Sequence, residues 1–358
     1  MITPAMRGVA RGIGIFFAVI LLGGAQPYAA AAEARDFTLA APPGAPIAAL
    51  KDVYLAPFAA AAGVNATGLS WDGDYADLVR NAGLFTPWDV VLVTAPVLEE
   101  GCARGMLQKL DWNAIGGRER YPAWAADDCG VGAFLTSVVL SWDNEKLQGT
   151  PSWADFWDVA KYPGKRGLRR DPRMTLEFAL LADGVAAGDV YAMLRTEDGI
   201  KRAFRKLDQL RPYIVWWEKP EEATRILGEG KVLMTMAPSA EVVTADREGA
   251  HHFGVQWSES LYRVKSFAIV TGSPNTALAQ KFLALAGDPA AEARLFAATA
   301  YGPLAKGALD QIPPERRGQV PSNPANLKTA LAFDENFWEQ NGDRLALRFE
   351  AWLAQPPH

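Results

Sequence analysis

Apolar and polar residues alternate along the chain with two periods, one typical of buried strands and one of amphipathic helices. Short apolar runs predict strands at 37–41, 88–94, 166–169, 214–217, 232–236 and 266–270. Apolar residues at helical spacing predict helices at 47–62, 97–107, 153–159, 176–182, 189–210, 221–227 and 239–247. From Thr276 onward the pattern is helical, with breaks at 313–314 and 321–324. This alternation predicts an α/β fold with a largely parallel sheet.

A second series of strands and helices begins near Leu140, which predicts two lobes for a chain of this length. Parallel strands place ligands at their carboxyl ends, so two lobes joined by crossover strands would enclose a ligand cleft that faces those ends. Closure of the lobes about a hinge is then the expected mechanism of binding.

The first 32 residues follow a different pattern. Arg7 and Arg11 precede an apolar run at 13–22, and small residues follow, ending in four alanines at 29–32. This arrangement predicts a signal peptide cleaved near these alanines, and therefore a periplasmic protein. A membrane anchor is the alternative, but the run is shorter than the about 20 residues that span a bilayer. No cysteine lies near the cleavage point and the arginines are not adjacent, so we expect neither a lipid anchor nor export in the folded state.

Charge and motifs narrow the function further. The formal net charge is -5, and loss of the two arginines with the signal peptide makes it -7, which disfavours a nucleic-acid partner. The chain has no G-x-S-x-G and no H-E-x-x-H motif, so we predict no catalytic residue. We expect no cofactor, because a binding protein gains its affinity from burying the ligand as the lobes close. An exported hydrolase or transferase on a similar framework is the alternative from another class.

Cys102 and Cys129 are the only cysteines. In an oxidising compartment an even pair predicts one structural disulfide. We expect no metal site, because no histidine lies near this pair and the adjacent His251 and His252 would face opposite sides of a strand.

A series of short motifs carries a family resemblance. The motifs are Trp88–Thr94, Cys102 with Gly105–Leu107, Leu110–Trp112, Asp128–Gly132, Ser141–Asp143, Ser152–Asp158, Pro163–Arg166, Leu176–Leu180, Ser266–Ile269, Gly272–Asn275 and Phe337–Glu339. In order and spacing they resemble the periplasmic solute-binding proteins of the spermidine/putrescine type, over nearly the whole mature chain. The resemblance implies the two-lobe periplasmic binding protein fold, with hinges near Leu140 and Tyr262, and a small organic solute delivered to an inner-membrane ABC permease. We expect a monomer.

The domain boundaries follow from the resemblance. They are a signal peptide at 1–32, lobe 1 at 33–140 plus 262–320, lobe 2 at 141–261, and a C-terminal helical segment at 321–358 that packs on the lobes.

In that family carboxylates pair the ammonium groups of a polyamine and aromatic rings pack against its methylene chain, as a flexible dication requires. Asp171 matches one such carboxylate, and a cap for the following helix is the alternative role. The next acidic position falls on or near Met174, with Glu177 a helical turn further on as an approximate substitute. Met236 stands where the family has a tryptophan. The family's aromatic and acidic pair falls on Arg263 and Lys265.

These departures favour a ligand that carries a carboxylate, phosphate or phosphonate beside any amine, because arginine and lysine bind such anions. The alternative is that Arg263 and Lys265 face solvent. A shift of one residue in this strand would exchange its two faces.

The remaining candidates are aromatic, acidic or hydroxyl side chains. Trp216 and Trp217 end a strand and face opposite sides, and we assign Trp217 to the ligand. Packing alone is the alternative for both. Glu218 could pair an amine or begin a helix, and Thr94 matches a hydroxyl position of the family. The predicted ligand-binding residues are Thr94, Asp171, Trp217, Glu218, Ser239, Arg263, Lys265 and Tyr301.

The sequence thus predicts the substrate-binding protein of an ABC importer, which captures a small amine-containing solute of the polyamine class by lobe closure. The alternative on the same fold is a zwitterionic or anionic solute bound through Arg263 and Lys265. A module that docks its liganded form on a chemoreceptor is a further possibility.

Overall fold

The computed structural model describes residues 35–249 and 251–355. The predicted signal peptide lies outside these residues. The strands are β1 (Phe37–Ala41), β2 (Ala66–Ser70), β3 (Val90–Val93), β4 (Gly130–Asp143), β5 (Arg166–Arg169), β6 (Ile214–Trp217), β7 (Met234–Pro238), β8 (Phe253–Ile269) and β9 (Leu331–Ala332). The first helices are α1 (Ala45–Leu50), α2 (Ala56–Ala62), α3 (Tyr75–Asn81), α4 (Ala95–Ala103), α5 (Trp153–Trp157), α6 (Pro172–Ala182) and α7 (Val190–Leu194). The later ones are α8 (Glu197–Leu210), α9 (Pro220–Gly228), α10 (Ser239–Arg247), α11 (Thr276–Ala286), α12 (Pro289–Thr299), α13 (Pro324–Leu327) and α14 (Glu335–Leu353).

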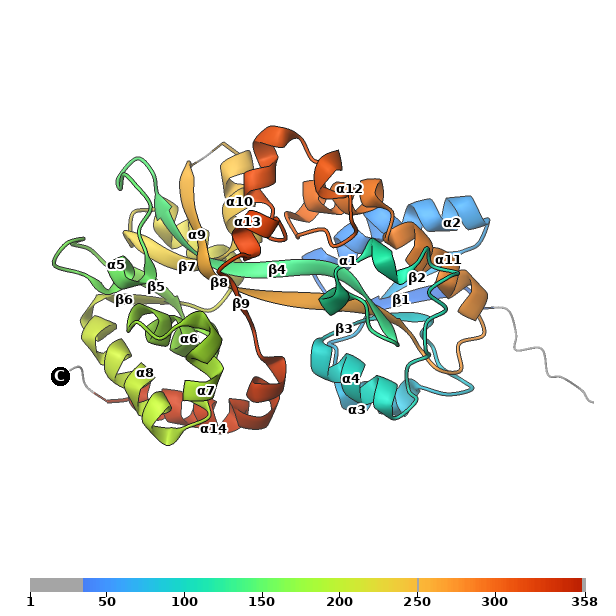
Figure 1. The fold of residues 1–358 in the computed structure, drawn as a ribbon, viewed down its shortest axis with the longest axis horizontal. Coiled ribbons are helices and arrows are strands. Elements are labelled where there is room, and N and C mark those ends of the chain that lie inside the picture. The colour runs from blue at the N-terminus through green and yellow to red at the C-terminus, as the bar shows by residue number, and fades with distance from the viewer. Residues whose placement is uncertain (1–34, 250, 356–358) are drawn as a thin grey trace, which may run out of the picture. The chain divides into compact units, whose positions relative to one another are not determined.

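The strands of the described residues form one sheet in the order β2-β1-β3-β8-β4-β7-β5-β6, and β9 pairs with β8. Each end of the sheet is parallel, as the alternation of strands and helices predicts. The middle is antiparallel, because the long strands β4 and β8 pair with each other and with β7 and β3. In Figure 1, β4 and β8 run side by side between the two parallel groups.

Two large apolar cores lie toward the two ends of this central pair, and both strands contribute to each core. The first core gathers buried side chains from 37–135 and 267–305, and the second gathers them from 138–261 and 331–352. A smaller cluster covers the opposite face of β1, β3 and β8 from the first core. Strand β3 is therefore buried on both faces, which explains its uninterrupted apolar sequence. The predicted α/β fold of two-lobe binding proteins is confirmed; the predicted lobe boundaries stay a prediction.

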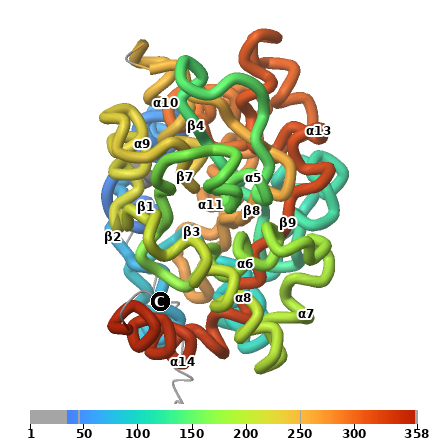
Figure 2. The backbone as a smooth tube through the Cα atoms, turned by 90° about the vertical axis from the view of Figure 1, so that its left-hand side faces the viewer, coloured from blue at the N-terminus to red at the C-terminus, as the bar shows by residue number. Residues whose placement is uncertain are grey.

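The C-terminal helix α14 packs along the second core. The buried apolar residues that it contributes to that core are Phe337, Trp338, Leu345, Phe349 and Trp352. Figure 2 shows α14 at the bottom of the molecule, whereas α9 and α10 lie in its upper part. Its first turn also reaches α4, since Asn336 Nδ2 donates to Glu99 Oε2 at 3.2 Å.

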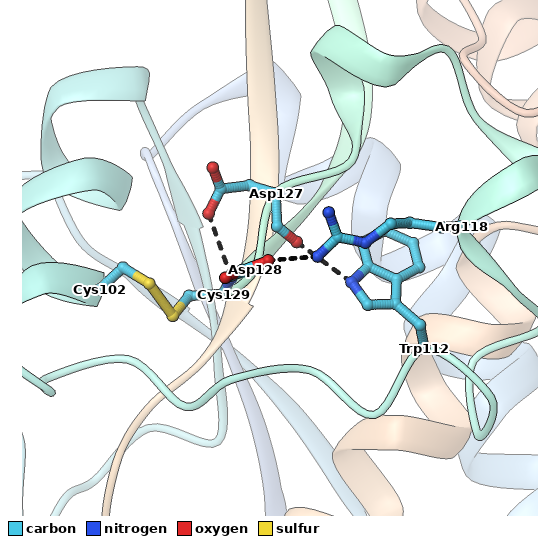
Figure 3. Close-up of a disulfide and its surroundings, with 6 residues drawn as sticks. All are labelled: Cys102, Trp112, Arg118, Asp127, Asp128 and Cys129. Carbon is cyan, nitrogen blue, oxygen red and sulfur yellow. Dashed lines mark hydrogen bonds and ion pairs between the residues drawn. A yellow bond between two sulfur atoms is a disulfide. The ribbon is translucent and has the colours of Figure 1, made fainter.

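The predicted disulfide is present and joins the end of α4 to the residue before β4. Cys102 and Cys129 are 5.7 Å apart at their Cα atoms. Beside it, Cys129 N donates to Asp127 Oδ1 at 3.1 Å, and Arg118 pairs with Asp128 (Figure 3). The Arg118 guanidinium also lies 5.0 Å from the Trp112 ring centroid. The disulfide and this cluster fix the path of the long segment that leads from α4 to β4.

Candidate ligand-binding site

A cavity of about 370 Å³ lies where the elements of the two cores meet. On one side it is lined by the starts of α3 and α4, and on the other by the start of α6, strand β8, Phe333 and the first turns of α14. The lining residues are Gly73, Asp74, Tyr75, Thr94, Pro96, Val97, Arg173, Arg263, Phe333, Glu335, Trp338 and Glu339. Several charged and aromatic side chains from distant parts of the chain therefore face one space.

Arg263 is the central cation of this cavity. It lies opposite Thr136 in the β4–β8 pairing, and its guanidinium carbon is 3.6 Å from the centroid of the Phe333 ring. Its Nε is buried and has no hydrogen-bond partner among the described residues. Burial lowers the pKa of Arg263, and Glu335 opposes this shift. A desolvated guanidinium with an unused donor is suited to an incoming anion.

Further cations surround Arg263. Arg173 lines the cavity from the start of α6. Arg169 lies close enough to contribute to lowering the pKa of Arg263, and Lys265 has its own pKa lowered, first by burial and then by Arg263. Glu335 opposes the shift of Lys265. The wall formed by β5, α6 and β8 is therefore rich in positive charge.

Glu335 is the acid that pairs with Arg263, whereas Asp171 pairs with Arg173 and Arg169. Glu335 is the first residue of α14, its side chain is 12% exposed, and its Oε1 lies 3.8 Å from Arg263 Nε. Its Oε2 accepts a hydrogen bond of 3.1 Å from the backbone N–H of Ala95, at the start of α4. Glu335 thus connects an element of the second core with a helix of the other side.

Trp338 is held in place from behind by a buried carboxylate. Its Nε1 donates to Glu177 Oε1 at 2.6 Å, and Tyr191 OH donates to the same oxygen at 2.9 Å. Glu177 is fully buried, and burial raises its pKa to about 7. On the cavity side, the Arg173 guanidinium lies 5.7 Å from the Trp338 ring centroid. The Trp338 side chain, near the start of α14, is thereby held from both sides.

Two predicted site residues, Thr94 and Arg263, line this cavity. Lys265 is half-buried and does not line the cavity, but it lies close enough to Arg263 and Glu335 for both to influence its pKa. Asp171 caps α6, because its Oδ1 accepts from Arg173 N at 2.8 Å, and its Oδ2 lies 3.5 Å from Arg173 Nη1. Asp171 does not line the cavity itself, but it holds Arg173, which does.

The other candidates do not line this cavity. Trp217 is buried in the second core, whereas its neighbour Trp216 packs edge-on against Phe349 at 5.6 Å between ring centroids. Glu218 is exposed, with Oε1 3.8 Å from Arg170 Nη1. Ser239 is buried at the start of α10, and Tyr301 stacks on Phe134 at 4.7 Å between ring centroids. A ligand role for these four residues stays a prediction.

Sequence reasoning did not identify most of the lining. The missed chemical groups are Asp74, Tyr75, Arg173, Phe333, Glu335, Trp338 and Glu339. Within residues 333–339 the signal was available: an aspartate that caps a helix, Asp334, is embedded in a run of aromatic and acidic residues. Nothing in the sequence places that run against α4.

Within the described ranges, no group of three or more histidine, cysteine, aspartate or glutamate side chains could hold a metal ion. In the same residues, no helix is both long enough and apolar enough to cross a membrane.

Residues 54–328 match the family model described as bacterial extracellular solute-binding protein. The chain belongs to this family. A gamma-aminobutyric acid-binding protein of Pseudomonas aeruginosa is 38% identical to this solute-binding protein over 343 residues, which cover 95% of this chain and 97% of the relative.

Solved structures show the same relationship. The Atu4243-GABA receptor is similar with a TM-score of 0.76 at 27% identity, covering 90% of this chain and 99% of that one. The binding protein MotA from A. tumefaciens B6, in complex with glucopine, is similar with a TM-score of 0.71 at 27% identity, covering 89% and 99%. This chain is thus a solute-binding protein; two of these relatives are named for GABA and one was solved in complex with glucopine.

Proposed function

We propose that this protein is the periplasmic substrate-binding component of an ABC importer and captures a small zwitterion that carries a carboxylate and an ammonium group. Gamma-aminobutyrate is the natural test ligand, since two relatives carry its name. The solute would enter the cavity between the two cores, and closure of the lobes would present it to a membrane permease. Membership of the solute-binding protein family supports a role in binding a solute and not in catalysis.

The observation that carries the proposal is the pairing of opposite charges within one cavity. Arg263 and Arg173 offer donors to a carboxylate, Glu335 and Glu339 offer acceptors to an ammonium, and Trp338 supplies an apolar face. Aromatic faces attract cations and pack against methylene groups, so a short amino acid fits this arrangement.

The polyamine specificity expected from the resemblance has less support. The relatives named above bind GABA or glucopine by name, which favours the zwitterionic alternative. A dication could pair Asp74, Glu335 or Glu339, but it would also meet Arg263 and Arg173 in the same cavity, and like charges repel.

Isothermal titration calorimetry on the mature protein tests the proposal. We expect binding of gamma-aminobutyrate or 5-aminovalerate, and no binding of putrescine or spermidine under the same conditions. Tight binding of a polyamine, with no binding of either amino acid, would refute the zwitterionic ligand and restore the polyamine prediction.

Substitution of Arg263 provides the first residue-level prediction. Arg263→Gln should weaken binding of the amino acid by roughly 10- to 100-fold, because a charge-assisted hydrogen bond contributes about 1.5 to 3 kcal/mol. The matched control is Arg225→Gln, which removes an exposed arginine of α9 that pairs with Glu229. Equal affinities of the two variants in calorimetry would exclude Arg263 from the site.

A further inference from the structure

The carboxylate of Glu335 occupies a position that suits a ligand carboxylate. It accepts from Ala95 N at 3.1 Å, at the amino end of the nine-residue helix α4, and lies 3.8 Å from Arg263 Nε. The helix dipole and the guanidinium both favour negative charge at this point. The cap residue Thr94 makes no side-chain hydrogen bond to the helix, so its hydroxyl does not compete for these N–H groups.

The group that fills this position comes from the opposite side of the cavity. Glu335 begins α14, whose next residues Phe337 and Trp338 are anchored in the second core, whereas Val97 and Leu98 of α4 pack in the cluster behind β3. Asn336 reinforces the contact through Glu99. The two sides are therefore held together by a side chain, at the place where a bound solute would hold them.

Glu335 is an incomplete partner for Arg263. Asp171 Oδ2 already lies 3.5 Å from Arg173 Nη1 and 3.8 Å from Arg169 Nη2, so Arg263 and Lys265 are the two cations whose charge Glu335 opposes. The Glu335 carboxylate reaches Arg263 only at 3.8 Å, outside hydrogen-bond distance, and Arg263 Nε remains unpartnered within the described part of the chain. A free carboxylate that can approach more closely would be a better partner.

We propose that Glu335 is a resident carboxylate, which the carboxylate of an incoming zwitterion replaces at Ala95 and Arg263, and which then pairs the ammonium of that same ligand. This inference rests on the proposed function. No covalent bond forms or breaks; the one ion pair between Glu335 and Arg263 gives way to two, which the ligand makes with Arg263 and with Glu335.

The exchange explains selection for zwitterions by charge alone. A dication could pair Glu335 but would leave Arg263 and the end of α4 without an anion. A simple carboxylate could replace Glu335 but would bring no ammonium to pair the carboxylate that it displaces. A ligand with both charges supplies a partner to Arg263 and to the displaced Glu335, and an unpaired charge in a partly buried site is the costly outcome in either other case.

The test compares gamma-aminobutyrate with butyrate, which lacks only the amine. We expect Glu335→Gln to weaken gamma-aminobutyrate at least 10-fold, because its ammonium loses a partner. The same variant should bind butyrate at least 10-fold more tightly than the unmodified protein, because a neutral amide is displaced more easily. The control Glu350→Gln removes an exposed acid of the same helix, which pairs with Arg170, and should change neither affinity.

Three results would overturn the exchange: equal loss of both ligands, no change in either, or a loss of gamma-aminobutyrate with no gain of butyrate. If the unmodified protein binds no amino acid at all, the proposed function fails instead, so the two failures are distinguishable. A second measurement does not depend on the variant. In a crystal structure with gamma-aminobutyrate, Glu335 should face the ligand nitrogen, and a Glu335 carboxylate still bonded to Ala95 N would contradict the proposal.

Discussion

At the scale of single residues, the site depends on charged side chains that are partly or fully buried instead of exposed to water. Arg263 follows from the sequence, because a basic residue stands where a related family carries an aromatic one, and the structure places it in the cavity. Glu335 does not follow from the sequence, whereas Glu177 lies in the Leu176–Leu180 motif and is an approximate substitute for an acid of the related family. The tertiary packing of α14 on α4 and α6 gives both residues their neighbours.

Glu177 makes stability depend on pH. Its pKa is raised to about 7 by burial, from an ordinary value near 4.5. Between these values the folded protein holds a proton that the unfolded chain has released, so stability should fall as pH rises from about 5 to 8, by up to about 3 kcal/mol from this group. Glu292, whose pKa burial raises to about 8, adds to the same trend.

Urea unfolding at several pH values measures this effect. Glu177→Gln should flatten the decline while keeping an acceptor for Trp338 Nε1, and the exposed-site variant Glu350→Gln should leave the slope as it was. A pH slope unaltered by Glu177→Gln would show that Glu177 is ionised throughout this range.

At the scale of elements, the hydrophobic periodicity predicts the bounds of a helix or strand correctly where that periodicity is uniform along the element. Strands β1 and β6 and helix α10 have the bounds predicted from periodicity. Strand β4 was missed, and only the last part of β8 was predicted. Both strands pass from one core to the other, and register shifts at 132–134 and 138–140 of β4 interrupt the two-residue period.

The segment 189–210 was predicted as one helix, but it forms α7 and α8 with a break at 195–196. Thr196 caps α8 by accepting from Gly199 N at 3.0 Å, a role that apolar periodicity does not reveal. Gly199 is required there because a Cβ atom would lie 2.0 Å from Met193 O, a backbone atom that has little freedom to move.

Gly199→Ala should therefore lower the free energy of unfolding by about 1 to 3 kcal/mol, the usual effect of forcing an extra methyl into packed structure. The matched control is Gly188→Ala, where the added Cβ has no heavy atom within 4 Å, and its stability should stay within about 0.5 kcal/mol of the unmodified protein. Chemical denaturation of the three proteins measures both effects. Equal stabilities would mean that the turn at 193–199 relaxes at little cost.

At the scale of the whole molecule, one sheet serves two cores. The first core is completed only by residues 267–305, and the second only by residues 331–352. A smaller cluster of Val243, Phe296, Ala300, Ile312 and Val320 adds a contact between α10 and α12. The fold class can be predicted from the alternation of strands and helices. That segments 267–305 and 331–352 complete the two cores cannot be predicted in this way, because it depends on contacts between residues far apart in the sequence.

The disulfide acts on the unfolded chain as a whole. It closes a loop with a sequence separation of 27 residues. Replacing both cysteines by serine should lower the free energy of unfolding by about 3 to 4 kcal/mol on the chain-entropy model. Urea unfolding of Cys102→Ser/Cys129→Ser beside the oxidised protein measures this difference. A coincident transition would indicate that the cluster around Asp127 and Arg118 constrains the loop without the covalent link.

The pairing of β3 with β8 also determines when the protein can fold. Val93 pairs with Ser266, so the ribosome completes β3 long before it makes the strand that covers its edge. Until then the apolar run Val90–Val93 presents an unpaired edge, which invites association with other chains. Nascent chains that stop before residue 262 should therefore need chaperones to stay soluble. We expect the late synthesis of β8 to delay folding, which suits a chain that is predicted to cross a membrane before it folds.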